Sequence, residues 1–303
     1  MTQSIKSEAH CDGVVRMVAL KSGHKIWTRT SKQGTVPIML LHGGAGLTHE
    51  IFDEWEQFLA PQGFQVIVYD QLDCYNSDKP NDPALWTIER YAEEVEEVRQ
   101  GLGLDKIYLL GYSWGAVLAM EYACNYQQHL NGLVFSDFTA SAKSYEKRIQ
   151  YLRTTLPVEA QKIFNDLEAS NEVGNQLWQD TMATYLFPRY FFKLKEWPEP
   201  LIRTMNHLNW PLCLHFNGKN DFIIDGAMKD WDRWGDLPNI TVPTLVIAGD
   251  QDLLSIDDAN KMAALLPHGS VRIVPGASHV PFYENQQDYF QALLGFLSVA
   301  NRA

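Results

Sequence analysis

The most informative stretch of this sequence is 106–125, KIYLLGYSWGAVLAMEYACN, in which an apolar run leads through a glycine-flanked serine into small helix-forming residues. The run Lys106–Leu110 predicts a buried strand, and Ala116–Asn125 predicts a helix. A serine hydroxyl attacks well only when a sharp turn presents it to a base. Gly111 and Gly115 permit that turn, because a Cβ at either position would crowd the strand or the helix. The pattern predicts that Ser113 is a catalytic nucleophile.

A second glycine-rich turn, His42-Gly43-Gly44-Ala45-Gly46, follows the short apolar strand Pro37–Leu41. The intermediate formed when a serine attacks a carbonyl needs two N–H donors for its oxygen. We expect the N–H groups of Gly44 and of Trp114, the residue after the nucleophile, to form this oxyanion hole. A dinucleotide-binding loop is the alternative, but the turn lacks the third glycine and the acidic ribose contact of that motif.

Two aspartates, Asp250 and Asp252, follow the predicted strand Thr244–Ala248 and compete for the role of catalytic acid. We assign Asp252 to the site and expect Asp250 to form hydrogen bonds within the loop. Asp137, which follows the predicted strand Gly132–Ser136, is a third location for an acid, although an ordinary loop aspartate is the favoured interpretation there.

The general base is expected to be His279, in the loop after the predicted strand Val271–Val274. Among the nine histidines, it is the one that lies both after the acid and after a strand end. The resulting order along the chain, serine then aspartate then histidine, is one that serine hydrolases use.

Strand and helix patterns alternate along most of the chain, which is typical of a mainly parallel sheet flanked by helices. The other predicted strands are an antiparallel pair, Val14–Leu20 and Lys25–Thr30, and Phe64–Tyr69; the other predicted helices are Thr87–Leu102, Ile256–Leu266 and Gln286–Ala300. Between Thr139 and Asp236 the alternation stops, and the segment is rich in aromatic residues. We therefore expect a core domain, 1–138 and 237–303, and a helical cap, 139–236. The cap aromatics either form its own core or line a pocket.

Composition limits the classes of function. The chain has 303 residues, and 25 Lys and Arg against 37 Asp and Glu give a net charge of −12. This acidity argues against binding to nucleic acid, and no apolar stretch approaches the ~18 residues of a membrane span. The segment Met1–Met17 has no signal-peptide pattern, so we expect a cytoplasmic protein. The four cysteines and nine histidines have no metal-binding spacing; we expect reduced thiols and no metal or cofactor.

Together these motifs resemble the α/β-hydrolase fold over essentially the whole chain and, in finer detail, the proline iminopeptidase family of serine peptidases. The stretches that carry the resemblance are His42-Gly43-Gly44-Ala45-Gly46, Tyr69-Asp70-Gln71, Gly111-Tyr112-Ser113-Trp114-Gly115, Asn217-Gly218-Lys219-Asn220-Asp221-Phe222 and Lys229-Asp230-Trp231-Asp232. The resemblance implies a mostly parallel eight-stranded sheet with an inserted cap. It also places Asp221 where relatives carry a glutamate for the free amine of the substrate, and Leu253 where several carry a second glutamate.

The activity implied by this resemblance is release of an N-terminal residue, proline or another small or apolar amino acid, from short peptides or amino-acid amides through an acyl-enzyme. A carboxylesterase or lactonase with the same triad is the alternative, and a non-hydrolytic lyase or receptor is a third. Asp221 is either the amine-binding group or a turn residue paired with Asn220. The oligomeric state stays open.

Overall fold

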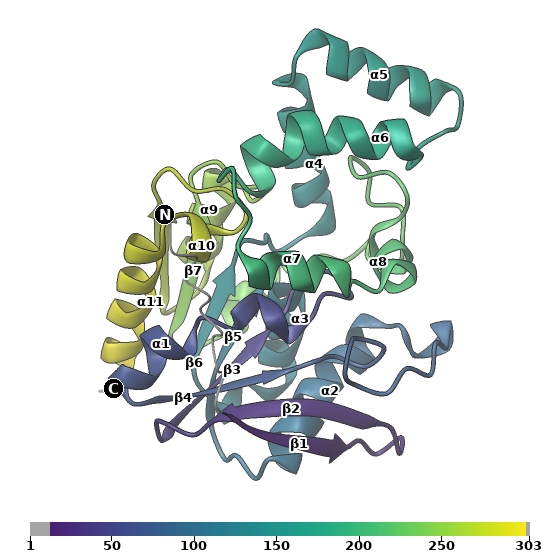
Figure 1. Cartoon of the computed structure of the whole chain (residues 1–303). Coiled ribbons are helices and arrows are strands. Elements are labelled where there is room, and N and C mark those ends of the chain that lie inside the picture. The colour runs from purple at the N-terminus through teal and green to yellow at the C-terminus, as the bar shows by residue number, and fades with distance from the viewer. Residues whose placement is uncertain (1–12, 301–303) are drawn as a thin grey trace, which may run out of the picture.

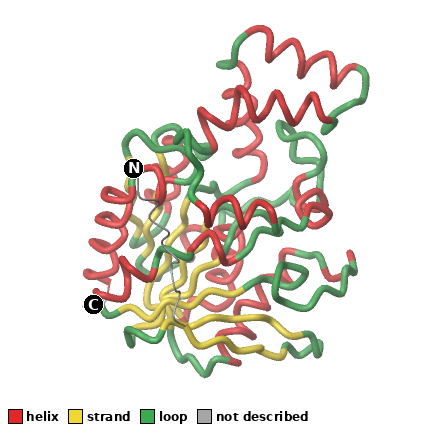
Figure 2. The backbone as a smooth tube through the Cα atoms, viewed as in Figure 1, coloured by secondary structure: helices red, strands yellow, loops and turns green. Residues whose placement is uncertain are grey.

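The computed structural model describes residues 13–300, and an eight-stranded sheet lies at its centre (Figures 1 and 2). The strand order is β1-β2-β4-β3-β5-β6-β7-β8. β2 pairs antiparallel with β1 and with β4, and all other neighbours pair parallel. The strands are β1 (Gly13–Ala19), β2 (Lys25–Ser31), β3 (Val36–Leu41), β4 (Phe64–Tyr69), β5 (Ile107–Tyr112), β6 (Leu130–Ser136), β7 (Thr244–Gly249) and β8 (Gly269–Val274). The predicted mostly parallel eight-stranded sheet is confirmed.

Helices cover both faces of this sheet, so its inner strands are apolar on both sides. In β3, for example, Ile38 and Leu40 pack with one layer while Met39 and Leu41 pack with the other. The first layer contains α1 (Glu56–Leu59), α10 (Pro281–Glu284) and α11 (Gln286–Ala300), and the second contains α2 (Ile88–Gly101), α3 (Trp114–Tyr126) and α9 (Ile256–Leu265). Short 3-10 helices connect the elements: η1 (His49–Phe52), η2 (Ala60–Gln62), η3 (Pro83–Leu85), η4 (Gln127–His129) and η6 (Leu237–Asn239).

The first residues of α2 and α3 can be compared with the helix starts that the sequence predicts. α2 begins where predicted, because the Thr87 side chain accepts a hydrogen bond from the Arg90 N–H and so caps the helix. β5 and α3 leave a single residue, Ser113, between them. Both elements therefore extend closer to the serine than the sequence predicts, which makes the turn sharper.

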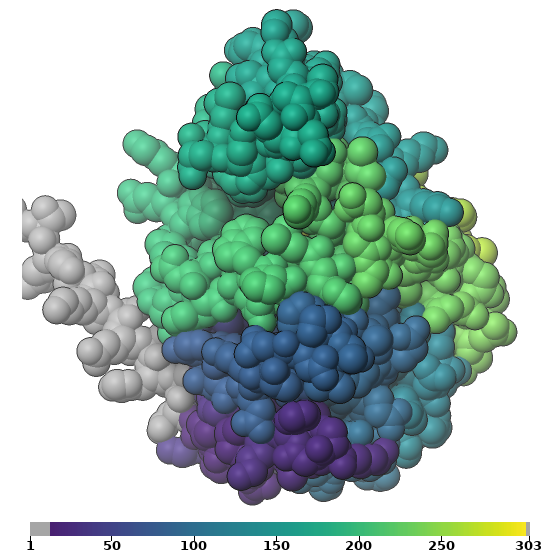
Figure 3. Space-filling view, turned by 90° about the vertical axis from the view of Figure 1, so that its right-hand side faces the viewer, coloured from purple at the N-terminus to yellow at the C-terminus, as the bar shows by residue number. Residues whose placement is uncertain are grey.

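Helices make up most of the segment between β6 and β7 as far as Asn217, and loops with the short turn η6 form the rest. The helices are α4 (Ala142–Thr154), α5 (Val158–Ala169), α6 (Gln176–Thr181), the π-helix η5 (Met182–Phe191), α7 (Glu199–Asn206) and α8 (Trp210–Asn217). α4, α5, α6 and η5 share a small apolar core that includes Phe164 and Trp178, whereas Leu212 and Phe216 of α8 pack into the main core. Figure 3 shows the α5–α6 lobe standing over the layer of α7 and α8, with a recess between them.

No helix within residues 13–300 is long and apolar enough to span a membrane. Cys74, Cys124 and Cys213 are free thiols, as predicted, whereas Cys11 lies outside the described residues.

Candidate active site

Ser113 stands at the top of the sheet in a backbone conformation that L residues rarely adopt, with φ 53° and ψ −119°. The two flanking glycines make this turn possible. A Cβ on Gly111 would meet the carbonyl oxygen of Gly115 at 2.0 Å, and one on Gly115 would meet the carbonyl oxygen of Leu41 at 2.1 Å. The steric argument made from the sequence is thus borne out: only glycine lets the strand and helix approach closely enough to expose the serine.

The fold brings Ser113, His279 and Asp252 together. Nε2 of His279 lies 3.0 Å from the Ser113 Oγ, and Nδ1 lies 2.6 Å from Oδ1 of Asp252. His279 and Asp252 are almost entirely buried. Because the carboxylate can only accept, it selects the tautomer with a proton on Nδ1 and leaves Nε2 free to accept the serine proton.

The other two candidate aspartates lie elsewhere. The Asp250 Oδ2 accepts a hydrogen bond of 3.0 Å from the Gly276 N–H, and so joins the loops after β7 and β8. Asp137 is fully buried, with φ 62°, and its carboxyl lies within hydrogen-bonding reach of Asp252. Asp137 thus lies in the loop after β6, as favoured from the sequence, and His279 pairs with Asp252 instead; what the sequence did not predict is that Asp137 is buried.

Two contacts from the helical segment hold the loops that carry Asp252 and His279. Arg148 of α4 donates from Nε and Nη2 to the carbonyl oxygen of Asp252, at 3.2 and 2.9 Å. The N–H of His279 donates to the carbonyl oxygen of Tyr190 in η5 at 3.2 Å. The sequence analysis missed both residues, and a charged residue on a predicted helix carries no signal for such a contact.

The two candidate oxyanion donors flank Ser113 in the same cavity. The N–H of Trp114 is the first in α3 and has no acceptor inside its helix. Within residues 13–300 no acceptor faces the N–H of Gly44, whose φ of 122° favours glycine. Gln71 ties both sides together: its Nε2 donates to the His42 carbonyl at 3.2 Å, and its Oε1 accepts from the Trp114 indole at 2.9 Å.

His42 supports this loop as a neutral side chain. It is fully buried, and burial lowers the pKa of its imidazole to about 4. Its Nε2 accepts a hydrogen bond of 3.1 Å from the Gln71 N–H. The imidazole therefore acts as a fixed hydrogen-bonding group rather than as a second base.

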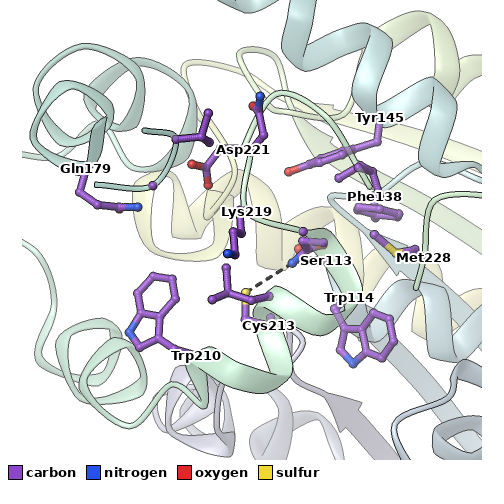
Figure 4. A pocket seen from close by; sticks show the side chains of 18 residues that line it. Ser113, Trp114, Phe138, Tyr145, Gln179, Trp210, Cys213, Lys219, Asp221 and Met228 are labelled. Carbon is purple, nitrogen blue, oxygen red and sulfur yellow. Dashed lines mark hydrogen bonds between the residues drawn. The ribbon is translucent and has the colours of Figure 1, made fainter. Parts of the chain in front are cut away.

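A cavity of about 590 Å³ opens above Ser113 (Figure 4). Its floor is formed by the nucleophile and oxyanion loops, and its walls come from the helical segment. Phe138, Tyr145 and Met228 lie beside Ser113, while Asp221, Lys219 and Gln179 occupy another side (Figure 4). Cys213 also lines the cavity, but burial raises the pKa of its thiol to about 11, which keeps it protonated at neutral pH. The aromatic residues of the helical segment thus divide between its own apolar core and the wall of the cavity.

Asp221 lines this cavity, and a hydrogen bond from a buried tryptophan holds its side chain there. Its Oδ2 accepts a hydrogen bond of 2.6 Å from the indole N–H of Trp178, which is itself fully buried. The surrounding protein removes enough water to raise the pKa of the Asp221 carboxyl, although the Trp178 hydrogen bond opposes this rise. The side chain remains accessible from the cavity. Within residues 13–300 no cation pairs with it.

Asn220 and Leu253, the two residues that the sequence analysis weighed beside Asp221, make contacts of their own. Asn220, not Asp221, holds the local turn, since its Oδ1 accepts from the Phe222 N–H at 2.9 Å. Leu253, at the position of a second glutamate in several relatives, packs into the apolar core of the helical segment. Among the described residues 13–300, Asp221 is the one carboxylate that lines the cavity.

The sheet topology, the serine on its sharp turn and the residues gathered around it define an α/β hydrolase, and residues 36–286 match the family model described as alpha/beta hydrolase fold. A proline iminopeptidase from Flavobacterium johnsoniae is 35% identical over 283 residues, which cover 91% of this chain and 95% of that protein. A proline iminopeptidase from Elizabethkingia meningoseptica is 33% identical over 280 residues, 90% of this chain and 93% of that protein. The chain belongs to the proline iminopeptidase family and is a serine hydrolase.

A solved structure agrees with this placement. The crystal structure of a proline iminopeptidase from Mycobacterium smegmatis superposes with a TM-score of 0.87 at 25% sequence identity, covering 95% of this chain and 98% of that chain. The likeness extends through the helical segment, because so little of either chain is left uncovered.

Proposed function

We propose that this protein is an aminopeptidase that releases an N-terminal residue, proline or another small or apolar amino acid, from short peptides or amino-acid amides. Ser113 attacks the carbonyl carbon while its proton passes to Nε2 of His279. The N–H groups of Gly44 and Trp114 stabilise the oxyanion. His279 then protonates the leaving amine, and water hydrolyses the acyl-enzyme by the same route. The serine–histidine distance of 3.0 Å and the histidine–aspartate distance of 2.6 Å support these roles.

The observation that carries the proposal is that Asp221 is the one carboxylate, among the residues that the structure describes, in the cavity of the nucleophile. An ammonium group that enters a partly dehydrated site loses hydration, and it needs a charge-assisted hydrogen bond in return. Asp221 offers one, because the Trp178 indole occupies one of its oxygens and no protein cation pairs with it within residues 13–300. Binding the free α-amine there would restrict cleavage to the first residue of a peptide.

The apolar wall beside Ser113 supports a preference for a small apolar side chain. Phe138 and Met228 are buried and face the same cavity as the nucleophile. Burying a pyrrolidine ring or a methyl group against this wall would be favourable by about 25 cal/mol for each Å² of apolar surface removed from water. We further propose that residues 139–236 form the cap subdomain that limits access to short substrates.

Asp221→Asn tests the amine site. On aminoacyl p-nitroanilides, kcat/KM should fall by about 10²-fold, because a charged partner is lost. On neutral acyl p-nitrophenyl esters it should change little. Asp230→Asn is the matched control, because Asp230 is exposed on the same segment and does not line the cavity; it should leave both activities unchanged.

Equal losses on both substrate classes would replace this proposal with the carboxylesterase or lactonase alternative. The apolar Leu253 in place of a second carboxylate is the observation that favours that alternative. Labelling of Ser113 by a fluorophosphonate is expected in either case, and its absence would contradict any serine mechanism.

A further inference from the structure

Two fully buried carboxyl groups lie side by side behind the catalytic histidine. Asp137 follows β6, and Asp252 lies in the loop after β7. These strands are parallel neighbours, and the N–H of Asp137 donates to the carbonyl of Ile247 at 3.0 Å. Both aspartates are 0% exposed. The sheet thus fixes the backbone of Asp137, and the loop after β7 brings Asp252 to it.

Each carboxyl has one oxygen without a hydrogen bond. Within residues 13–300, Oδ1 of Asp137 and Oδ2 of Asp252 have no donor, although the two groups are within hydrogen-bonding reach of each other. No Lys, Arg or His of the described chain pairs with Asp137. The titratable groups that act on it or feel its charge are Asp252 itself, Tyr112 of β5 and Tyr289 of α11.

Two buried negative charges in contact, with no cation at one of them, are too costly to coexist, and such pairs retain a proton. Burial and the charge of Asp252 raise the pKa of the Asp137 carboxyl well above its ordinary value. One proton placed between the two groups would satisfy both orphaned oxygens at once.

The hydrogen-bond partners of the two aspartates determine which carboxyl group holds that proton. Asp252 receives the His279 Nδ1 hydrogen bond, and the Arg148 guanidinium lies on its carbonyl oxygen; both favour a negative charge at Asp252. The Asp137 Oδ2 instead accepts from the neutral Ser136 hydroxyl at 2.5 Å, and that hydroxyl lies 3.0 Å from the Tyr289 hydroxyl. The O–H groups can therefore all donate in the same direction. Tyr289 donates to Ser136, Ser136 donates to Asp137, and Asp137 donates to Asp252.

We propose that Asp137 is a positioning residue: as a neutral carboxylic acid it donates its O–H to Oδ2 of Asp252 and fixes that carboxylate for His279. The hydrogen bond from Asp137 stops the carboxylate of Asp252 from rotating away and satisfies the lone pair that faces the core. This role rests on the proposed triad and goes beyond it, since Asp137 touches neither substrate nor reacting atoms.

The test measures the rate at which a fluorophosphonate labels Ser113, which does not depend on the identity of the substrate. Asp137→Asn should label within about 3-fold of the wild-type rate, because an amide can donate to Asp252 and accept from Ser136 just as a neutral acid does. Asp137→Leu should label about 10- to 100-fold more slowly, because it leaves a buried charged acceptor without its donor. A loss in Asp137→Asn as large as in Asp137→Leu would show that the charge of Asp137 is needed and would overturn the proposal.

A double-mutant cycle separates positioning from general stability. In an Asp252→Asn background, adding Asp137→Leu should slow labelling by no more than about 3-fold, since the group through which it acts is already changed. The same loss in both backgrounds would point to a structural role and count against the proposal. If wild-type Ser113 is not labelled at all, the triad itself fails, and that outcome is distinct from normal labelling of Asp137→Leu, which refutes only the role of Asp137.

Infrared difference spectroscopy covers the case in which Asp137→Leu does not fold. The spectrum of the wild type minus that of Asp137→Asn at pH 7 should contain the C=O stretch of a protonated carboxylic acid. A carboxylate band in its place would mean that Asp137 is ionised and that the proposal is wrong.

Discussion

At the scale of single residues, Ser113 combines a strained backbone with a hydroxyl group within hydrogen-bonding distance of Nε2 of His279. Its φ of 53° costs of order 1–3 kcal/mol for a residue with a side chain, which the surrounding close packing must offset. In return the hydroxyl stands clear of β5 and α3 and faces His279.

Replacing the triad members gives an ordered set of losses. Ser113→Ala or His279→Ala should each lower kcat by about 10⁶-fold, because the triad acts as a unit, and Asp252→Ala should cost less. Asp250→Ala should cost far less again, since the Asp250 carboxylate accepts from the Gly276 N–H and His279 pairs with Asp252. Steady-state kinetics on the substrate panel checks the order. Greater damage from Asp250→Ala than from Asp252→Ala would mean that the acid is wrongly assigned.

Gly115 can be tested by stability alone. A Cβ there would lie 2.1 Å from a backbone carbonyl oxygen, so Gly115→Ala should lower the free energy of unfolding by about 3 kcal/mol or more. Gly295→Ala is the matched control, because Gly295 lies on the exposed face of α11 and a Cβ there meets nothing within 4 Å. It should raise stability by about 1 kcal/mol. Urea denaturation of both variants measures the difference, and equal stabilities would contradict the steric argument.

At the scale of elements, the contact between α2 and α3 is organised around one carboxylate. Glu96 of α2 accepts from Arg99 at 2.6 and 2.8 Å, from Gln100 at 2.7 Å and from Tyr122 of α3 at 2.8 Å. Burial raises the pKa of Glu96, but these hydrogen bonds outweigh it and lower the pKa to about 2. The ionised form of Glu96 therefore contributes to the packing of α3, the helix that follows the nucleophile.

The lowered pKa of Glu96 predicts the direction in which stability changes as the pH falls. A carboxyl whose folded pKa lies below its unfolded value of about 4.3 stabilises the protein above that value, and the contribution is lost as the pH falls toward about 2. Glu96→Gln should lower the unfolding free energy at pH 7 by about 2–3 kcal/mol and flatten its decline below pH 4.3. Urea titrations between pH 7 and 2.5 would show this; an unchanged slope in the variant would count against it.

At the scale of the whole molecule, charges join α7 of the helical segment to η1 beside the sheet. Arg203 donates to Asp53 at 2.5 Å and to Glu50 at 3.2 Å, and His207 lies 2.6 Å from Glu50. Glu50 and Asp53 are buried, whereas the Arg203 side chain is 38% exposed. The helical segment is thus tied to the sheet layer by contacts that salt can partly screen.

Arg203→Met should loosen α7 without unfolding the core. We expect a loss of about 1 kcal/mol in stability and faster amide exchange confined to α7, with a smaller difference at high salt. Arg189→Met is the control, because in the part of the chain that the structure describes Arg189 donates only to the carbonyl of Tyr185 within its own helix. Uniform exchange across the molecule in both variants would show that the network does not secure the cap.

The regular elements could be predicted from the sequence, and so could the two residues, Ser113 and His279, that the structure brings within hydrogen-bonding distance. Strand periodicity, the Thr87 cap and the glycines around Ser113 act over a few residues, so their effects are visible in the order of side chains alone. His279 was found because chain order and strand ends restrict the choice. Short helices such as α1 and α10 were missed, since four residues carry too weak a pattern.

The sequence by itself determined the elements, the glycine-dependent turn and the residue types available for chemistry, because these depend on local sterics and polarity. Only the tertiary structure decided their partners. The Asp137 beside Asp252, the Arg148 on the Asp252 carbonyl and the Trp178 indole on Asp221 are contacts between distant segments. Such contacts follow from how the sheet and helices pack, and packing also sets the burial that separates a neutral carboxyl from a charged one. No pattern of neighbouring residues encodes that difference.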